Sequence, residues 1–229
     1  MSTYQKKKPT VVPWSYSRLT AFETCPRRFY LTSIAKVVKE EQTQATLHGN
    51  EVHKALELYV GGKAALPTKY ASYKPIADKI RMAPGTKHLE YKFGLTKMLQ
   101  PTTFFADDVW CRGVLDVGVV REKSATALDW KTGKRKLDSQ QLKLFAGASF
   151  ALWPHIQTVK TGFIWLPTNQ MDTEVFTRDQ MKPIFQEFAI RVHRMELAEK
   201  NDDWPANPSG LCREWCPVGR SLCEHCGKP

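Results

Sequence analysis

The spacing of apolar residues changes along the chain, and each change marks a different kind of element. Residues 44–60, QATLHGNEVHKALELYV, carry apolar side chains at helical spacing, and Gly61 and Gly62 follow as a stop signal. Residues 88–95, HLEYKFGL, instead alternate apolar and polar positions, which is typical of a half-buried strand. We therefore predict a long helix, a second helix near 72–82 and then the first strand of a sheet.

The alternation continues downstream and predicts a sheet of several strands. Further strands are expected at 109–120, 125–130, 158–166 and 171–177, with helices at 138–152 and 178–199. The segment REKS forms the turn between the first two of these strands, and Asp138 or Ser139 is a candidate cap for the first of these helices. The order of elements predicts an α/β fold in which helices flank a mixed central β-sheet.

The two ends of the chain differ in composition from the middle. The polar, basic, proline-bearing start predicts a flexible arm, and two short helices should follow it, the first capped by Ser15 or Ser17 and the second begun by Pro26. At 229 residues the chain fits one large domain with a sizeable core. We expect a basic arm at 1–13, the main domain at 14–204 and a cysteine-rich C-terminal segment at 205–229 that packs on it.

Two single aspartates lie within the most apolar strand segments, Asp116 in one and Asp129 in the next. An ionised carboxylate inside a sheet is costly unless it is compensated, and two on neighbouring strands repel each other. Mg²⁺ or Mn²⁺, which prefer oxygen ligands, would remove that cost. Lys131 shares a face with Asp129, because side chains alternate along a strand. The three residues together favour a metal-dependent hydrolytic site.

The acid-x-lysine pattern alone is weak, because Glu90-Tyr91-Lys92 repeats it, and each acid taken singly would suit a turn or a sheet edge. Gly49 and His53 strengthen the case, since residues four apart share a helix face. Glycine inside a helix costs about 1 kcal/mol relative to alanine, which implies a packing reason. A close approach of this helix to the sheet would supply that reason and would bring His53 to the carboxylates.

Five motifs in chain order resemble the RecB-like branch of the PD-(D/E)XK nuclease superfamily. This branch includes nuclease domains of bacterial recombination exonucleases, CRISPR-associated adaptation nucleases and many phage exonucleases. The resemblance covers roughly residues 15–226 and departs from the family where phenylalanine replaces a usual tyrosine. It implies a restriction-endonuclease-like core. The motifs are Gly49-x3-His53, Glu90, Gly113-x2-Asp116, Asp129-Trp130-Lys131 and Gln141-x3-Phe145.

The resemblance also implies a role for each motif residue. The metal, Mg²⁺ or Mn²⁺, would be held by His53, Asp116, Asp129 and the backbone carbonyl of Trp130, and would activate a water for attack on the phosphodiester. Asp116, Asp129, Lys131 and Gln141 form the implied catalytic set. Within it, Lys131 would orient the water or stabilise developing charge, and Gln141 would steady the site or the substrate strand. The supporting residues are Gly49, Glu90, Gly113 and Phe145.

Four of the six cysteines crowd into residues 212–226, which in a reducing compartment favours metal or cluster ligation. The family resemblance implies a [4Fe-4S] cluster that ties Cys25 to three of them, although their C-x3-C-x6-C-x2-C spacing is looser than the family pattern. A zinc site built wholly from the tail, or simply reduced thiols, are the alternatives. Cys111 is expected to be an ordinary buried thiol. The implied cluster ligands are Cys25, Cys212, Cys216 and Cys223, with Cys226 as an alternative ligand.

The balance of charge points to a polyanionic partner. The formal net charge is +11, with 34 Lys+Arg against 23 Asp+Glu, and DNA is the leading candidate, although a solvated basic surface would account for the same numbers. No apolar run is long enough to span a membrane, and the first residues lack the apolar core of a signal peptide. We expect a cytoplasmic protein of a bacterial or phage-infected cell.

Together these features predict a divalent-metal-dependent DNA nuclease. Its substrate would be single-stranded DNA or DNA ends, bound with tolerance of sequence, and an exonuclease is favoured over an endonuclease. Recombination, repair or phage DNA metabolism would be its setting, with any helicase or recombination partner still unidentified. One alternative is a non-catalytic, nuclease-like DNA-binding module with a structural zinc site, for which the Asp116, Asp129 and Lys131 set has no purpose. Another is a zinc-bearing interaction protein, which leaves the charge and His53 unexplained.

Overall fold

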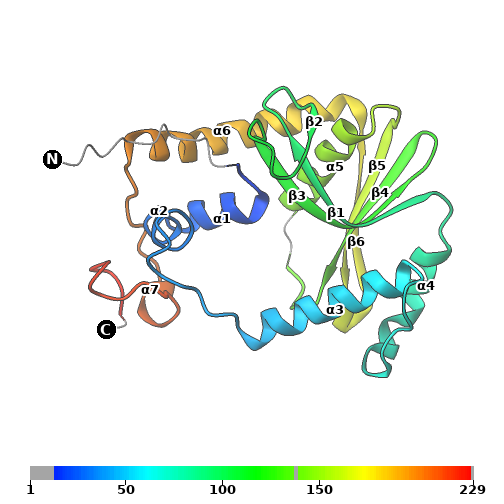
Figure 1. The fold of residues 1–229 in the computed structure, drawn as a ribbon, viewed down its shortest axis with the longest axis horizontal. Helices are drawn as coiled ribbons and strands as arrows, with labels where there is room; N and C mark the ends of the chain where they lie inside the picture. Colours follow the sequence, from blue (N-terminus) through cyan, green and yellow to red (C-terminus); the bar gives the residue numbers. More distant parts are fainter. Residues whose placement is uncertain (1–12, 137–138, 228–229) are drawn as a thin grey trace. The chain divides into compact units, whose positions relative to one another are not determined.

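The computed structural model describes residues 13–136 and 139–227, and the chain divides into two compact units that are described separately. One unit consists of Gln42–Gln186, and the other joins the residues up to Glu41 with those from Glu187 onward. The expected N-terminal arm, residues 1–13, lies outside the described residues except for Pro13. Figure 1 labels the elements of both units.

The unit of residues 42–186 is built on a six-stranded sheet with the order β2-β1-β3-β4-β5-β6. Neighbouring strands are antiparallel except β4 and β5, which are parallel. The predicted mixed sheet is thereby confirmed, and only the two-residue β2 was not expected. The strands are β1 (Thr86–Leu95), β2 (Pro101–Thr102), β3 (Cys111–Val120), β4 (Ser124–Lys131), β5 (Thr158–Trp165) and β6 (Gln170–Thr177).

The helix α3 (Gln44–Val60) packs on this sheet together with the 3-10 helix η2 (Thr68–Tyr73) and α4 (Lys74–Met82) (Figure 1). Thr43 caps α3 by accepting a hydrogen bond from the backbone of Thr46, and Gly61 ends it. One buried cluster combines α3, η2 and α4 with inward residues of β3, β4 and β5. Its members include Val52, Leu56, Tyr59, Val117, Leu128, Trp130 and Ile164.

The helix α5 (Gln140–Leu152) provides the crossover between the parallel strands β4 and β5. Parallel neighbours require such a connection, and α5 is buried along nearly its whole length. Ser139 stands at its N-cap without a capping side-chain hydrogen bond in the described structure, and the other expected cap, Asp138, lies outside the described residues. Arg178 satisfies the far end by donating to the carbonyls of Phe150 and Trp153.

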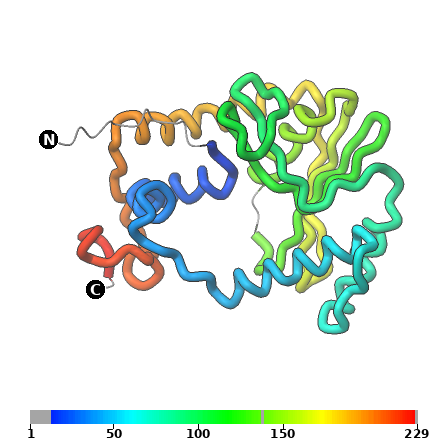
Figure 2. The backbone as a smooth tube through the Cα atoms, viewed as in Figure 1, coloured from blue at the N-terminus to red at the C-terminus, as the bar shows by residue number. Residues whose placement is uncertain are grey.

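The other unit holds α1 (Tyr16–Thr24), α2 (Pro26–Phe29) and the π-helix η1 (Tyr30–Ile34). The predicted cap and start are confirmed, since Ser15 accepts from the backbone of Arg18 and Pro26 is the first residue of α2. Figure 2 shows the segments near the two ends of the chain, coloured blue and red, side by side in this unit. The backbone N–H of Arg27 accordingly donates to the Pro205 carbonyl at 3.2 Å.

The long helix α6 (Met181–Asn201) starts in the first-described unit and continues into the second along the chain. It begins three residues later than predicted, because the chain first makes the 3-10 turn η4 (Arg178–Gln180), which a capping box of Thr177 and Gln180 fixes. The short η3 (Leu166–Thr168) and α7 (Leu211–Glu214) were not expected. Within the described residues, no helix has both the length and the apolar character to traverse a bilayer.

Packing of α3 on the sheet should dominate the stability of the unit of residues 42–186. Leu56 is 0% exposed, so Leu56→Ala leaves a cavity and should lower the free energy of unfolding by about 2–5 kcal/mol. Leu47, which lies on the same helix but is 45% exposed, is the matched control, and Leu47→Ala should change it by less than about 0.5 kcal/mol. Urea unfolding followed by circular dichroism measures both, and equal losses would contradict the packing described.

Candidate active site

The strand β1 is irregular at Glu90. Its φ of 47° lies in the left-handed region, which costs a residue other than glycine about 1–2 kcal/mol. The register skips this position, because Leu89 pairs with Val117 and Tyr91 pairs with Leu115. The skipped residue on β3 is Asp116, so the two acids face each other at the one interruption of an otherwise continuous β1–β3 ladder.

The irregularity at Glu90 shifts the facing of β1 by one residue. The rings of His88 and Tyr91 both contact Trp153 at the end of α5, with centroid distances of 5.1 and 6.1 Å. In a regular strand, residues three apart would face opposite sides. The left-handed residue absorbs this shift, and its own carboxylate lies near His53 of α3.

The ladder between β3 and β4 stops just before the two aspartates. Its last pair is Val117 with Leu128, so the same antiparallel register would place Asp116 opposite Asp129 as the next pair. Instead, the backbone N–H of Trp130 donates to Oδ2 of Asp116 at 2.8 Å. A carboxylate thus takes the place of a backbone acceptor, and the predicted adjacency of the two acidic strands is confirmed.

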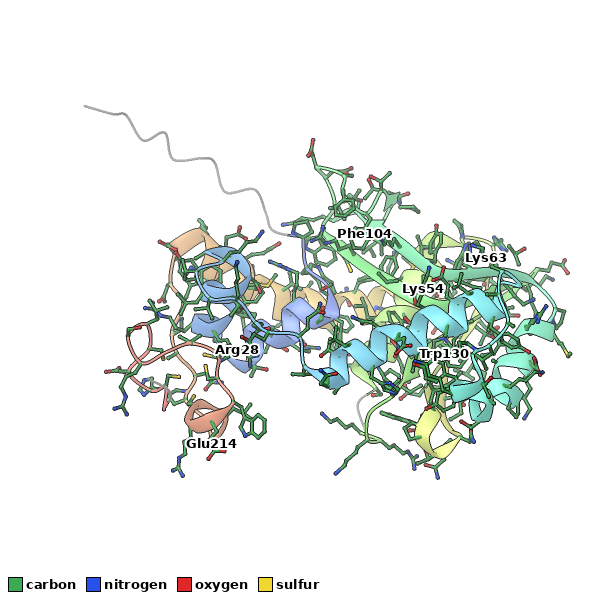
Figure 3. The ribbon with its side chains drawn as sticks, turned by 60° about the horizontal axis from the view of Figure 1, so that its bottom comes forward. Arg28, Lys54, Lys63, Phe104, Trp130 and Glu214 are labelled. Carbon is green, nitrogen blue, oxygen red and sulfur yellow. The ribbon has the colours of Figure 1, made fainter. Side chains whose placement is uncertain are left out.

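His53 of α3 lies between the acids and the backbone of β4. Its Nε2 is 2.9 Å from the Trp130 carbonyl, which can only accept, and its Nδ1 is 3.3 Å from Oδ2 of Asp116 and 3.9 Å from Oε1 of Glu90. One ligand atom each of His53, Glu90 and Asp116 lies within 4.8 Å of the others. In Figure 3 the labels of Trp130 and Lys54, the residue after His53, mark this region.

Gly49, four residues before His53, allows α3 to approach β4 closely. A Cβ at Gly49 would lie 3.3 Å from Oγ1 of Thr132, just after β4, which is tighter than ordinary van der Waals contact. The predicted close approach of the helix to the sheet is therefore confirmed. Gly113 has a different reason, because a Cβ there would come within 2.7 Å of the Phe93 ring.

Asp129, Lys131 and Gln141 form a second group beside the first. The Lys131 ammonium is 2.7 Å from Oδ2 of Asp129, as expected for residues that share a strand face. The Gln141 amide joins both, since its Nε2 donates to Oδ1 of Asp129 at 3.0 Å and its Oε1 accepts from Lys131 at 3.1 Å. The sequence did not indicate Phe163, whose ring centroid lies 4.7 Å from Nζ of Lys131 and supports it from β5.

Burial and mutual repulsion disturb the ionisation of these acids. Burial and the charge of Asp116 raise the pKa of Glu90 to about 6. Burial and Asp116 also raise the pKa of Asp129, against the opposing effect of Lys131. Burial lowers the pKa of His53, but the hydrogen bond and charge of Asp116 outweigh it, so the pKa of His53 is raised. The site therefore holds an excess of negative charge that favours a bound cation.

The donor set fits a divalent ion that prefers oxygen. Neighbouring ligands on an octahedral ion with bonds of about 2.1 Å lie about 3 Å apart, and the distance of 3.3 Å between Asp116 and His53 is close to this. Oδ2 of Asp129 is buried, and the Lys131 ammonium lies 2.7 Å from it. His53, Glu90 and Asp116 could therefore hold Mg²⁺ or Mn²⁺, and Asp129 lies in the adjacent group with Lys131.

The remaining motif residue, Phe145, lies on the buried side of α5 and is 4% exposed.

Cys111 is fully buried, and burial raises the pKa of its thiol, so the expected buried thiol is confirmed. Arg135 lies four residues after Lys131 and makes a bidentate ion pair with Asp172 of β6. This pair ties the segment that follows β4 to β6. The sequence carried no signal for this pairing, since the two residues lie on separate elements.

The unit that holds both chain ends brings five cysteines to one cavity. Its lining also includes Arg27, Arg28, Asn207 and His225. Backbone N–H groups point at two of the sulfurs, because Asn207 donates to Cys25 at 3.5 Å and Ser209 donates to Cys212 at 3.4 Å. The cysteines of the cavity are Cys25, Cys212, Cys216, Cys223 and Cys226.

A family model described as "PD-(D/E)XK nuclease superfamily" matches residues 13–224 of the chain. A search of curated protein sequences gives no match. Among solved structures, the "Putative exonuclease" from Eubacterium rectale superposes with a TM-score of 0.56 and 11% identity, over 93% of this chain and 90% of that one. The structure of SSO0001 superposes with a TM-score of 0.47 and 13% identity, over 96% of this chain and 88% of that one.

The backbone at Glu90 gives a prediction that is independent of catalysis. Glycine adopts a positive φ without the Cβ penalty, so Glu90→Gly should be more stable than Glu90→Ala by about 1 kcal/mol. Urea unfolding without metal compares the two variants, which both lack the carboxylate. If Glu90→Ala is the more stable protein, the left-handed conformation at this residue is contradicted.

Proposed function

The chain belongs to the PD-(D/E)XK nuclease superfamily, and we propose that the site around Asp116 and Asp129 hydrolyses DNA phosphodiester bonds with a divalent metal ion. The observation that carries this proposal is the convergence of acids from β1 and β3 on His53, with Asp129 and Lys131 of β4 beside them. A protein that only bound DNA would gain nothing from burying several carboxylates together, because they would repel phosphate.

His53, Glu90, Asp116 and Asp129 would hold the ion, together with the carbonyl of Trp130. A bound Mg²⁺ or Mn²⁺ would supply a Lewis acid and lower the pKa of a bound water. The chain itself fixes the ligands before the ion arrives. The Trp130 N–H sets the rotation of the Asp116 carboxylate, and the left-handed backbone at Glu90 accompanies a side chain whose Oε1 lies 3.9 Å from Nδ1 of His53. Such fixed ligands need little reorganisation when the substrate binds.

Lys131 would stabilise the negative charge that develops on the phosphoryl oxygens, or would orient the attacking water. Its ammonium is held between Oδ2 of Asp129 and Oε1 of Gln141 and lies over the Phe163 ring. These contacts confine a flexible side chain to one position, which is what charge stabilisation requires. Gln141 would thereby act as a positioning residue for both Asp129 and Lys131.

We further propose that the enzyme is a RecB-like exonuclease that acts on single-stranded DNA or DNA ends. The order of His53, Glu90, Asp116, Asp129, Lys131 and Gln141 along the chain supports the RecB-like branch. The similar Eubacterium rectale protein, described as a "Putative exonuclease", agrees with exonuclease action. The net charge of +11 supports binding through phosphates without base reading. Recombination, repair or phage DNA metabolism is the setting we propose for this activity.

The cysteine cavity would hold a [4Fe-4S] cluster that ties Cys25 to the tail. The five cysteines line one cavity, which supports this proposal. The backbone N–H groups that donate to Cys25 and Cys212 also support it, because hydrogen bonds to sulfur tune thiolate-bound iron. Burial raises the pKa of the Cys216 thiol, with nearby Cys226 adding to the effect, so a cation is needed to hold these sulfurs as thiolates. A zinc ion on the four tail cysteines is the alternative occupant.

Substitution within the site tests the proposed chemistry. Asp116→Asn, Asp129→Asn and Lys131→Ala should each lower the rate of DNA cleavage by about 10²-fold or more, because each removes a ligand or the charge-stabilising group. Labelled single-stranded and blunt duplex DNA, with Mg²⁺, Mn²⁺ or EDTA, would be followed on gels. Binding of the same DNA in EDTA should remain within about threefold for Lys131→Ala, since one phosphate contact among several contributes little to the affinity.

Lys79→Ala is the matched control, because it removes one exposed lysine on α4, away from the acids, and should cleave at the wild-type rate. Wild-type rates in all three site variants would contradict the assignment. A wild-type protein that binds DNA but never cleaves it with either ion would support the non-catalytic DNA-binding alternative instead.

The occupant of the cysteine cavity can be identified by elemental analysis. Protein purified without oxygen should be brown and contain iron and sulfide, and Cys25→Ser should lose both, because Cys25 closes the ligand set. Cys111→Ser is the control, since that thiol is buried in β3 outside the cavity. Colourless protein with one zinc per chain that Cys25→Ser does not disturb would instead establish the tail zinc site.

A further inference from the structure

An exposed aromatic pair lies on the segment between β2 and β3. Phe105 is 77% exposed, although a phenyl ring normally gains from burial. Its neighbour Phe104 contacts it edge to face, with ring centroids 4.9 Å apart and planes inclined at 75°. Figure 3 labels Phe104 on this segment, above α3 in that view. The local backbone is ordered by turns, since Ala106 donates to the Thr103 carbonyl at 3.2 Å.

Two cations from the adjoining strands lie over these rings. The guanidinium carbon of Arg112, in β3, is 5.0 Å from the Phe104 centroid and 5.8 Å from the Phe105 centroid. The ammonium of Lys92, in β1, is 6.0 Å from the Phe104 centroid. Aromatic faces combined with arginine and lysine are what proteins use to bind unpaired nucleic acid bases and their phosphates.

Acidic side chains are also present on this segment. Asp108 accepts a hydrogen bond from the Thr102 hydroxyl at 2.9 Å, so its carboxylate is engaged within the turn. Asp107 is exposed and would face solvent. The two cations, in contrast, are directed over the rings, so the aromatic surface itself presents positive charge.

The position of these residues relative to the candidate active site is set by the strands. Lys92 follows Glu90 by two residues on β1, and Arg112 precedes Asp116 by four residues on β3. At about 3.3 Å per residue these separations are about 7 and 13 Å along the strands. That length corresponds to about two to four nucleotides of a strand with a rise of about 3.4 Å.

We propose that Phe105, with Phe104 and Arg112, forms a stacking platform for an unpaired base of a DNA strand that enters the candidate active site. This inference rests on the proposed nuclease function and names its substrate as single-stranded DNA. A duplex offers no free base face within its interior, so the platform selects strands with unpaired bases near the cleavage point. A protein partner would suit a broad apolar patch, whereas here a ring is paired with cations.

The test measures binding in EDTA, where no cleavage occurs, by fluorescence anisotropy with the full-length chain. The probes are a labelled thymidine oligonucleotide, an abasic oligonucleotide with the same number of phosphates and a blunt duplex. Phe105→Ala should weaken binding of the thymidine oligonucleotide by about 5- to 100-fold, the loss of one base–aromatic stack. It should leave the abasic strand and the duplex within about twofold, and Phe105→Trp should restore binding of the thymidine strand.

Met82→Ala is the matched control, because Met82 is 80% exposed at the end of α4, and it should change none of the three affinities. Circular dichroism melts establish that the variants are folded, as expected for a side chain that makes few core contacts. Equal binding of the thymidine strand by wild type and Phe105→Ala, or equal losses on all three probes, would overturn the platform. Cleavage by Phe105→Ala then reports separately on the nuclease function, since the metal ligands are untouched.

Discussion

The gathering of carboxylates from three adjacent strands in one part of a sheet is the constraint around which this protein is organised. Glu90, Asp116 and Asp129 belong to three adjacent strands, and their side chains are partly or fully buried. Strand pairing is interrupted next to these acids on both sides of β3, with β1 at Glu90 and with β4 after Leu128. Backbone pairing is interrupted where negative charge is concentrated, and that charge is stable only when cations surround it.

The chain supplies those cations from two directions. His53 arrives on α3, which Gly49 allows to come close, and Lys131 arrives from the strand that carries Asp129. The side chains of His53 and Lys131 differ in how they can act. Lys131 is fixed by Gln141 and Phe163, whereas His53 can give up its proton and become a ligand. The charge beside Asp116 therefore depends on whether His53 carries a proton, whereas Asp129 has the Lys131 ammonium as its partner.

Much of this arrangement could be predicted from the sequence, and the reasons are local. Asp129 and Lys131 share a strand face by alternation, and a glycine four residues before His53 implied a close helix. The left-handed conformation of Glu90 could not be predicted, because HLEYKFGL alternates regularly while the strand it forms does not. Phe163 and the Arg135–Asp172 pair also escaped prediction, since they depend on which strands become neighbours.

The strand β4 is supported unequally along its two edges. Its ladder with β5 runs through Lys131, while its ladder with β3 ends at Leu128. The last residues of β4 thus form a short edge inside a sheet, flanked on both sides by paired strands. Exposed edges invite pairing with other chains, and proteins protect them by keeping them short and charged. This edge is instead buried, since Asp129 is 5% and Trp130 2% exposed, and the Asp116 carboxylate already accepts from the Trp130 N–H. The opened part of the sheet therefore offers that N–H to no other strand.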